Sequence, residues 1–343
     1  MRNKIQAEAV QAIVDNNYNC LIVVACRVGK TKLLLDSIRG KEDKKIAVVA
    51  PFNSILDSWR AEILKWDLGF TPTLLNIRSS EELPMDLDLL IIDECHQISD
   101  NQYKVIKSRN PKRIVGATGT LGNKNKQKLR QELGLTVKYD YSIEQAIEHN
   151  IISDYEIFIK EVILSPEERT AYNKLTKTFE YFKMLSFSDP KYVHVKNNAA
   201  LKRAQYIYRL ESKLKAAQSL IKPLKRVLVF TTLTEVADKL CKHSYHSKSK
   251  EDSLELFQKK KVNKLSCIGM LSMGFTGVGL KHAVIHQIQS NEELQIQKIL
   301  RTCNLEGDKK AQIYITVAKD TQDSVWLSSA LQGVSTSRIK YII

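Results

Sequence analysis

Residues 20–35 read CLIVVACRVGKTKLLL, and this stretch decides the fold. The apolar run 20–25 is rich in β-branched residues and predicts a buried strand. A loop follows it, and a helix is expected from about Thr31. Helical segments separate three further short apolar runs, at 46–50, 87–92 and 113–115. This alternation is typical of a parallel sheet that helices cover on both faces.

The same alternation returns in the last third of the chain. Apolar runs predict strands at 226–230, 264–270, 283–287 and 311–317. The stretch before them has a long helical periodicity, a high basic content and eight of the chain's 25 aromatic residues. We therefore expect an α/β protein with two tandem parallel-sheet lobes, over 1–158 and 223–343, joined by a helical connector over 159–222.

Composition excludes several classes of protein. The chain has 343 residues, and no apolar run approaches the length of about 20 residues that a membrane helix needs. Its first residues lack the apolar core of a secretory signal. Six scattered cysteines form no CxxC pair, which argues against a zinc ribbon and a disulfide framework. These features predict a cytoplasmic protein without membrane contact.

The charge is uneven along the chain. The net charge is +15, and residues 1–158 are almost balanced, with 22 basic and 21 acidic side chains. Residues 159–222 carry 13 basic and 6 acidic side chains, and residues 223–343 carry 18 and 11. Such an excess favours a polyanionic partner, of which nucleic acid is the common one. The alternative interpretation is a surface that only keeps the protein soluble.

The turn at 26–31 has the residues of a phosphate-binding loop. Backbone N–H groups and a helix N-terminus hold phosphate oxygens, Lys30 reaches the β- and γ-phosphates, and Thr31 reaches magnesium. The full pattern GxxxxGK[ST] is broken, because Val24 stands where the first glycine belongs. The alternative is an ordinary strand-to-helix turn with a threonine that caps the helix.

An acidic pair follows the run 87–92. Asp93 and Glu94 stand at the carboxyl end of a buried strand, and in a parallel sheet this end faces the phosphate loop. We expect Asp93 to hold magnesium through water and Glu94 to polarise the attacking water. The alternative is a polar loop after a strand.

Seven segments in this order resemble the motifs of superfamily-two helicases and translocases, over nearly the whole chain. DECH resembles their DEAD/DEAH box, and GATGTLGN resembles motif III in the form of Swi/Snf-type translocases. The resembling segments are 48–66 (motif Ia), 93–96, 116–123, 161–175, 211–231, 272–286 (motif V) and 297–304 (motif VI).

The resemblance implies two RecA-like lobes with ATP and Mg²⁺ between them. It implies that His96 couples the nucleotide to Thr118 and Thr120 of motif III, and that Gln6 reads adenine. The implied metal ligands are Thr31 and Asp93. The implied catalytic residues are Lys30, Asp93, Glu94, Gln297 and Arg301. The implied nucleotide-binding residues are Gln6, Arg27, Val28, Gly29, Lys30, Thr31, Lys32, Gly277, Gly279 and Arg301.

Motif VI departs from the family pattern. Asn304 stands in place of the second arginine, and Leu300 in place of the glycine. An arginine that stabilises the transition-state charge in phosphoryl transfer is worth about 1,000-fold or more in rate. We therefore expect either slow hydrolysis or an Arg301 that serves alone.

Two regions are candidates for nucleic-acid contact. Residues 101–131 contain nine Lys or Arg and no Asp or Glu, which predicts phosphate contacts or, alternatively, a solvated face. In the connector, basic residues interleave with aromatic residues that either stack on bases or pack between helices. These aromatics are Tyr172, Phe179, Tyr181, Phe182, Tyr192, Tyr206 and Tyr208.

The favoured interpretation is a monomeric ATP-dependent DNA helicase or translocase, with DNA preferred over RNA because motif III and 161–175 look Swi/Snf-like. This interpretation is compatible with a partner protein that loads the motor onto nucleic acid. The compact length of the chain fits a phage-encoded motor that acts in the host cytoplasm. One alternative is an RNA helicase. Another is a nucleotide-gated clamp on nucleic acid or protein that hydrolyses little ATP. Asn304, in place of the second motif VI arginine, is the reason to retain this alternative.

Overall fold

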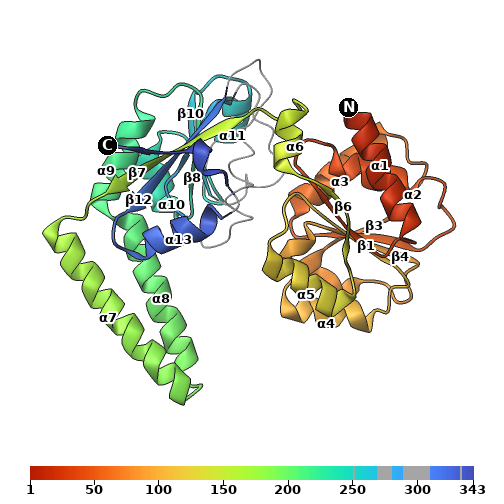
Figure 1. Cartoon of the computed structure of the whole chain (residues 1–343), viewed down its shortest axis with the longest axis horizontal. Coiled ribbons are helices and arrows are strands. Elements are labelled where there is room, and N and C mark those ends of the chain that lie inside the picture. The colour runs from red at the N-terminus through yellow and green to blue at the C-terminus, as the bar shows by residue number, and fades with distance from the viewer. Residues whose placement is uncertain (250–251, 269–279, 289–309, 333) are drawn as a thin grey trace. The chain divides into compact units, whose positions relative to one another are not determined.

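The computed structural model describes residues 1–249, 252–268, 280–288, 310–332 and 334–343 (Figure 1). The chain divides into two compact units, one over 1–152 and a second that begins at Ser153. Each unit has its own sheet, and every strand pairing in both sheets is parallel. Parallel neighbours require crossover connections, and in the described part of the chain helices supply most of them.

The first unit has a six-stranded sheet in the order β3-β2-β4-β5-β1-β6. Its strands are β1 (Cys20–Val24), β2 (Ile46–Ala50), β3 (Thr73–Asn76), β4 (Leu89–Asp93), β5 (Ile114–Thr118) and β6 (Val137–Tyr141). Its helices are α1 (Arg2–Asp15), α2 (Lys30–Ile38), α3 (Asn53–Lys65), α4 (Asp100–Ser108), α5 (Asn123–Leu133) and α6 (Ile143–Glu148), with 3₁₀ turns η1 (Ile77–Glu82) and η2 (Cys95–Gln97).

The central strands of this sheet are buried along their whole length, which explains their uninterrupted apolar sequence. Leu21, Val49 and Ile92 belong to one core cluster, on which Tyr103 and Leu129 pack from α4 and α5. The register sets Asp93 beside Ala117, and Val23 beside Thr118. The segments that follow β1, β4 and β5 therefore leave the sheet at one edge.

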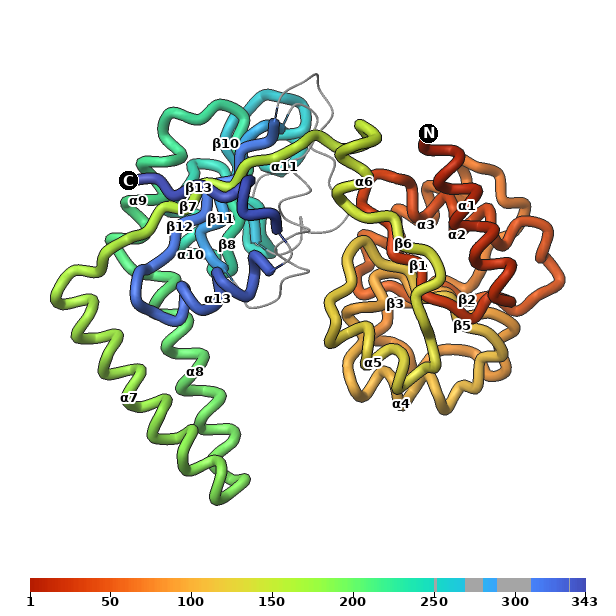
Figure 2. The backbone as a smooth tube through the Cα atoms, viewed as in Figure 1, coloured from red at the N-terminus to blue at the C-terminus, as the bar shows by residue number. Residues whose placement is uncertain are grey.

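The second unit has a seven-stranded sheet in the order β13-β7-β12-β11-β8-β10-β9. Figure 2 labels β7, β8, β10, β11, β12 and β13 on the backbone of this unit. Its strands are β7 (Tyr155–Val162), β8 (Val227–Thr231), β9 (Ser244–Tyr245), β10 (Lys264–Ile268), β11 (His282–Ile285), β12 (Ala311–Ala318) and β13 (Ile339–Ile342). The other elements described are α7 (Pro166–Ser188), α8 (Tyr192–Arg209), α9 (Glu211–Ile221), α10 (Thr234–Leu240), α11 (Ser253–Gln258), α13 (Gln322–Ala330) and η4 (Thr336–Arg338).

Strand β7 lies across the boundary at 158/159 expected from the sequence. It pairs with β12 along all of 155–162 and with β13 over four residues, so residues 155–158 lie in the second sheet. The first-lobe limit expected at 158 is therefore corrected to 152, where the first unit ends. The paired residues are 156 positions apart for β7 with β12 (155 and 311) and 182 apart for β7 with β13 (157 and 339), and no local sequence pattern indicates pairings over such distances.

Helices α7 and α8 form a hairpin that extends away from the sheet of the second unit (Figure 1). A capping box starts α7, in which Ser165 and Glu168 each accept a hydrogen bond from the other's backbone N–H. Helix α9 packs on β7, β11 and β12, so the last part of the expected connector covers the second sheet.

Candidate nucleotide site

The turn between β1 and α2 has the backbone geometry of a close-approach loop. Gly29 has φ 97°, a left-handed conformation that costs a side chain energy. A Cβ at Gly29 would lie 2.4 Å from Nε2 of Gln6. That same amide nitrogen donates to the carbonyl of buried Val28 over 2.6 Å. The hydrogen bond from Gln6 of α1 therefore fixes the turn, and the Gln6 side chain leaves no room for a Cβ at position 29.

Helix α2 begins at Lys30, at the carboxyl edge of the sheet. The first turn of a helix leaves backbone N–H groups without intrahelical partners, and these suit phosphate oxygens. Thr31 lies in this turn. Lys32, also implied as a nucleotide contact, pairs instead with Asp36 of its own helix and lies 5.0 Å from the ring centre of Trp66.

Lys30 bridges the acidic pair. Its Nζ lies 2.6 Å from Oε1 of Glu94 and 3.1 Å from Oδ1 of Asp93, and all three side chains are largely buried. Burial alone would lower the pKa of Lys30, but the two carboxylates outweigh it and the pKa lies above its ordinary value. The structure thus brings these three side chains together.

Asp93 has a second partner that the sequence did not reveal. The indole N–H of Trp59, on α3, donates to Oδ2 of Asp93 over 3.0 Å, while Oδ1 accepts the backbone N–H of Glu94 over 2.9 Å. Trp59 is fully buried. A buried indole N–H needs an acceptor, but the sequence shows neither that Trp59 is buried nor which acceptor it meets.

A hydrogen-bonded path leads from Glu94 to the segment after β5. Nδ1 of His96 lies 2.8 Å from Oγ1 of Thr118, which lies 3.4 Å from Oε2 of Glu94. The single hydrogen of the Thr118 hydroxyl is shared between this carboxylate and the carbonyl of Thr120, which lies 2.7 Å from Oγ1. Burial lowers the pKa of His96, so the imidazole is neutral near pH 7. Glu94 itself sits at φ 51°, a left-handed conformation that non-glycine residues rarely adopt.

The implied site residues of the second lobe lie outside the described residues. They are Gly277, Gly279, Gln297 and Arg301, together with the departures Leu300 and Asn304.

The basic run 101–131 is partly neutralised within the first unit. Lys107 pairs with Glu132, Lys112 with Asp88 and Lys128 with Asp100, so the acids come from outside the run or from its flank. The guanidinium of Arg109 donates to the carbonyl of Glu81. The number of basic residues in the sequence therefore overestimates the unpaired positive charge of this surface. The run's remaining basic residues are Lys104, Arg113, Lys124, Lys126 and Arg130.

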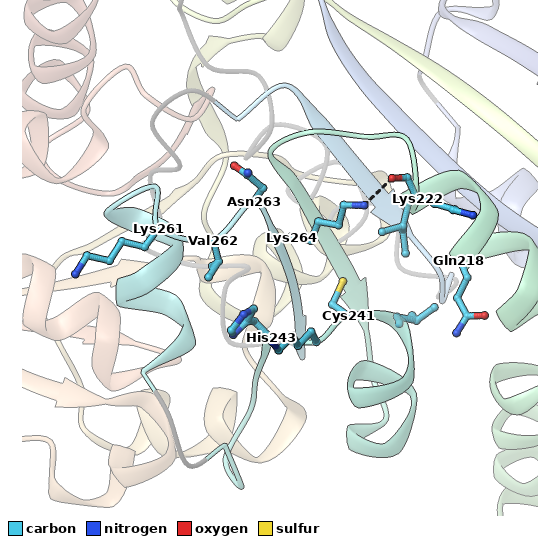
Figure 3. A pocket seen from close by; sticks show the side chains of 11 residues that line it. Gln218, Lys222, Cys241, His243, Lys261, Val262, Asn263 and Lys264 are labelled. Atoms are coloured by element: carbon cyan, nitrogen blue, oxygen red, sulfur yellow. Dashed lines mark hydrogen bonds between the residues drawn. The ribbon is translucent and has the colours of Figure 1, made fainter.

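A pocket of about 480 Å³ opens in the second unit near the amino end of β10 (Figure 3). Its basic side chains do not converge. Nζ of Lys264 donates to the carbonyl of Lys222 over 2.7 Å, and the Lys222 and Lys261 side chains extend in opposite directions. These three lysines therefore do not converge as the cations of a phosphate site would.

Among the described residues, no group of three or more His, Cys, Asp or Glu side chains is placed to hold a metal ion. Magnesium bound with nucleotide needs no such cage, since one or two protein ligands and the phosphates suffice. No helix in the described part of the chain is long and apolar enough to span a membrane.

Comparison with known proteins identifies the fold. No protein-family model and no curated protein sequence matches the chain. Among solved structures, S. cerevisiae Dbp5 bound to RNA and ADP BeF3 matches with a TM-score of 0.66 and 12% identity, over 99% of this chain and 89% of that chain. The Pyrococcus furiosus Hef helicase domain matches with a TM-score of 0.54 and 14% identity, over 96% and 97%.

A third match is the ATP-dependent Type ISP restriction-modification enzyme LlaBIII bound to DNA, with a TM-score of 0.62 and 13% identity. The match covers 99% of this chain but 31% of that enzyme, so the chain spans about a third of its length. The chain has the α/β fold of superfamily-two helicases, with two tandem RecA-like lobes. The fold class and the family resemblance expected from the sequence are confirmed at the level of the fold.

Proposed function

We propose that the protein is an ATP-dependent helicase or translocase that moves on nucleic acid, with DNA as the favoured track. The observation that carries the proposal is the position of Lys30, 2.6 Å from Glu94 and 3.1 Å from Asp93 at the carboxyl edge of the first sheet. A helix N-terminus, an ammonium group and two carboxylates meet there, which is the donor set that a magnesium nucleotide requires.

The residues present fit ATP and Mg²⁺. Thr31 and Asp93 would hold the metal with hard oxygen ligands, and Lys30 with the backbone of the turn would hold the phosphates. When bound, Mg²⁺ neutralises charge on the β- and γ-phosphate oxygens. In the protein alone, Lys30 neutralises the same two carboxylates, so we propose that it moves from them to the phosphates when nucleotide binds.

Glu94 is the proposed general base. Its carboxylate orients the attacking water and takes its proton, and the backbone at φ 51° fixes where that carboxylate points. The path through His96 and Thr118 supports a proposal that the state of the nucleotide is passed to motif III.

The remaining roles rest on the resemblance alone. We propose that Gln6 reads adenine, that Gly277 and Gly279 sense nucleotide, and that Gln297 and Arg301 complete the site. Motif III and 161–175 favour DNA, although Dbp5 in the solved structure is bound to RNA and LlaBIII to DNA. We further propose a cytoplasmic monomer.

Asn304 favours one second candidate, a nucleotide-gated clamp with little hydrolysis. The missing arginine removes a group that would stabilise the transition-state charge, while it leaves Lys30, Asp93 and Glu94 available to bind nucleotide.

One experiment separates these functions. ATP hydrolysis is measured at low salt with no polymer, single-stranded DNA, double-stranded DNA or RNA, for the wild type, Lys30→Ala and Glu94→Gln. A motor predicts that one polymer stimulates hydrolysis and that both variants lose it. ATP binding without hydrolysis under any polymer would reject the motor and favour the clamp.

A further inference from the structure

The α7–α8 hairpin is fixed firmly at its base. Arg203, which is 7% exposed, donates to Oε1 of Gln322 over 2.8 Å, and the backbone N–H of Gln322 donates to the Tyr172 hydroxyl over 2.8 Å. The guanidinium of Arg169 donates to the carbonyls of Lys319 and Asp320 over 2.8 and 2.7 Å. The hairpin is therefore held at a set angle to its own sheet.

Several aromatics of the hairpin are structural. Phe182 of α7 faces Tyr192 of α8, with ring centres 6.4 Å apart, and the Arg203 guanidinium lies 4.2 Å from the ring centre of Phe179. Tyr172 and Tyr208 are buried. These side chains hold the two helices together or to the unit, and they are not available to a ligand.

The outer face of α7 is different. Tyr181, Met184 and Phe187 are 60%, 71% and 82% exposed. They follow one another at intervals of three residues, which places them on one side of the helix. Three large apolar side chains in a row on a solvated surface mark a binding face more often than a neutral one.

Two lysines extend this face of α7 toward the base of the hairpin. Lys177 and Lys174 are exposed and lie one and two turns before Tyr181, respectively, on the same side of α7. The two carboxylates near the tip are already paired, Glu180 with Lys183 over 3.0 Å and Asp189 with Lys191 over 2.7 Å. Among the described residues no ion pair joins a carboxylate to Lys174 or Lys177, so both ammonium groups remain available to a ligand.

We propose that this outer face, defined by Lys174, Lys177, Tyr181, Met184 and Phe187, binds a single-stranded segment of nucleic acid. A single strand offers phosphates to the lysines and flat bases to the aromatic rings at the same time. A single strand leaves its bases free to stack, whereas a duplex hides them. The face extends for about 20 Å along the helix, long enough for several nucleotides. The inference rests on the proposed function and adds a contact outside the nucleotide site.

The test is binding of a fluorescent single-stranded oligonucleotide to the full chain without ATP, followed by anisotropy. Tyr181→Ala with Phe187→Ala weakens binding about tenfold, in line with the loss of base stacking. Lys174→Glu with Lys177→Glu weakens binding and lowers the slope of log affinity against log salt by about 1.4.

Matched controls separate this face from general effects. Ile163→Ala removes an apolar side chain of the same unit that is 78% exposed, and it leaves the affinity unchanged. Lys222→Glu with Lys225→Glu makes the same charge change at exposed lysines away from the hairpin, and it has a much smaller effect. An equal loss in controls and hairpin variants, or no loss in either, overturns the inference.

A second readout identifies the occupant. Photocrosslinking to an oligonucleotide that contains bromouracil labels the peptide with Tyr181 or Phe187, and adducts found only elsewhere overturn the inference. Sedimentation of the protein alone gives a monomer at assay concentration. A wild-type dimer that Phe187→Ala dissociates would show that a second copy covers the face, which also overturns it.

The outcomes distinguish this inference from the proposed function. If a polymer stimulates ATP hydrolysis in the wild type and in Tyr181→Ala/Phe187→Ala with equal half-saturating concentrations, the motor stands and the hairpin contact is rejected. If no polymer binds the wild type or stimulates it, the proposed function and the hairpin contact both fail.

Discussion

Trp59 holds one oxygen of Asp93, through an N–H···O hydrogen bond of 3.0 Å between its indole and Oδ2. Both residues are nearly inaccessible, at 0% and 3% exposure. The bond fixes the rotation of the carboxylate, so Oδ1 faces Lys30, from which it is 3.1 Å away. The indole thereby orients the proposed metal ligand from a helix that contributes no other group to the site.

Trp59→Phe keeps most of the packing and removes the N–H. It leaves Oδ2 of Asp93 buried without its donor, at a cost of about 1–3 kcal/mol. We expect kcat of the polymer-stimulated ATPase to fall about tenfold and the half-saturating Mg²⁺ concentration to rise. Steady-state kinetics over a Mg²⁺ series measure both quantities.

The matched control is Trp66→Phe, at the end of the same helix. The Trp66 indole bonds to Glu62, and Trp66 is 36% exposed, so its loss changes neither quantity. A Trp59→Phe enzyme with wild-type Mg²⁺ dependence would show that Asp93 is positioned without the indole.

Gly29→Ala tests the turn before α2. Its φ of 97° costs an alanine about 1–2 kcal/mol, and the new Cβ would press on Nε2 of Gln6 at 2.4 Å. Gln6 then loses its bond to the Val28 carbonyl. We expect lower stability in urea unfolding and weaker binding of a fluorescent ATP analogue.

Two further variants separate the effect of backbone strain from the effect of the clash with Gln6. Gly40→Ala introduces the same kind of strain, at φ 75°, where a Cβ would meet nothing within 4 Å. It lowers stability without changing nucleotide affinity. Gln6→Ala with Gly29→Ala relieves the clash, so a double variant no more stable than Gly29→Ala alone would argue against the clash.

Strands with a continuous apolar sequence could be predicted, and strands without one could not, including β7, which lies inside the second sheet between β13 and β12. The expected strand 46–50 coincides with β2, and 311–317 is β12 short of one residue. Both are buried and almost continuously apolar. β3 and β13 are half-exposed edge strands of four residues, and no continuous apolar run marks them.

The contacts of the candidate site also fall into those that could be predicted from the sequence and those that could not. Lys30, Asp93 and Glu94 could be placed together because parallel strands bring their carboxyl ends to one edge of the sheet. The bond from Trp59 to Asp93 joins residues 34 positions apart through a helix whose rotation only packing determines. The exposed aromatics of α7 could not be separated from the packed ones, because periodicity does not say which side of a hairpin helix faces its partner.

Lys213→Met tests a fully buried ion pair of the second unit. Lys213 and Asp323 are both 0% exposed, and Oδ2 of Asp323 also accepts the backbone N–H of Ala318 over 3.0 Å. Loss of the ammonium leaves the carboxylate buried without its counter-ion, which costs about 3–5 kcal/mol. Urea unfolding measures the change.

Two further variants test whether burial of the ion pair explains the lower stability of Lys213→Met. Lys213→Met with Asp323→Asn recovers part of the stability, because a neutral amide replaces the lone charge and still accepts from Ala318. Lys215→Met, which breaks the exposed pair with Glu211 at 3.6 Å, changes the free energy of unfolding by less than about 1 kcal/mol. Equal effects of Lys213→Met and Lys215→Met would contradict the role given to burial.

His286 makes the stability of the second unit depend on pH. Burial, followed by the charge of Lys213, lowers the pKa of His286 from 6.5 to about 3. Its ring lies 3.2 Å from the Tyr208 carbonyl and 3.3 Å from the Thr316 hydroxyl. Between pH 6.5 and 3 the unfolded chain binds a proton at this position that the folded chain does not bind. Stability therefore falls as the pH drops through that window, by up to about 1.4 kcal/mol for each pH unit.

We expect this residue to contribute about 2 kcal/mol to the difference in unfolding free energy between pH 7 and pH 5. His286→Gln keeps groups that bond to Tyr208 and Thr316 but takes up no proton, so its unfolding free energy changes less between these pH values. Urea unfolding at pH 5, 6 and 7 provides the comparison, with His194→Gln, at an exposed position of α8, as a control that keeps the wild-type slope. A slope that is the same in His286→Gln and the wild type would mean that His286 takes up its proton equally in the folded and unfolded chains.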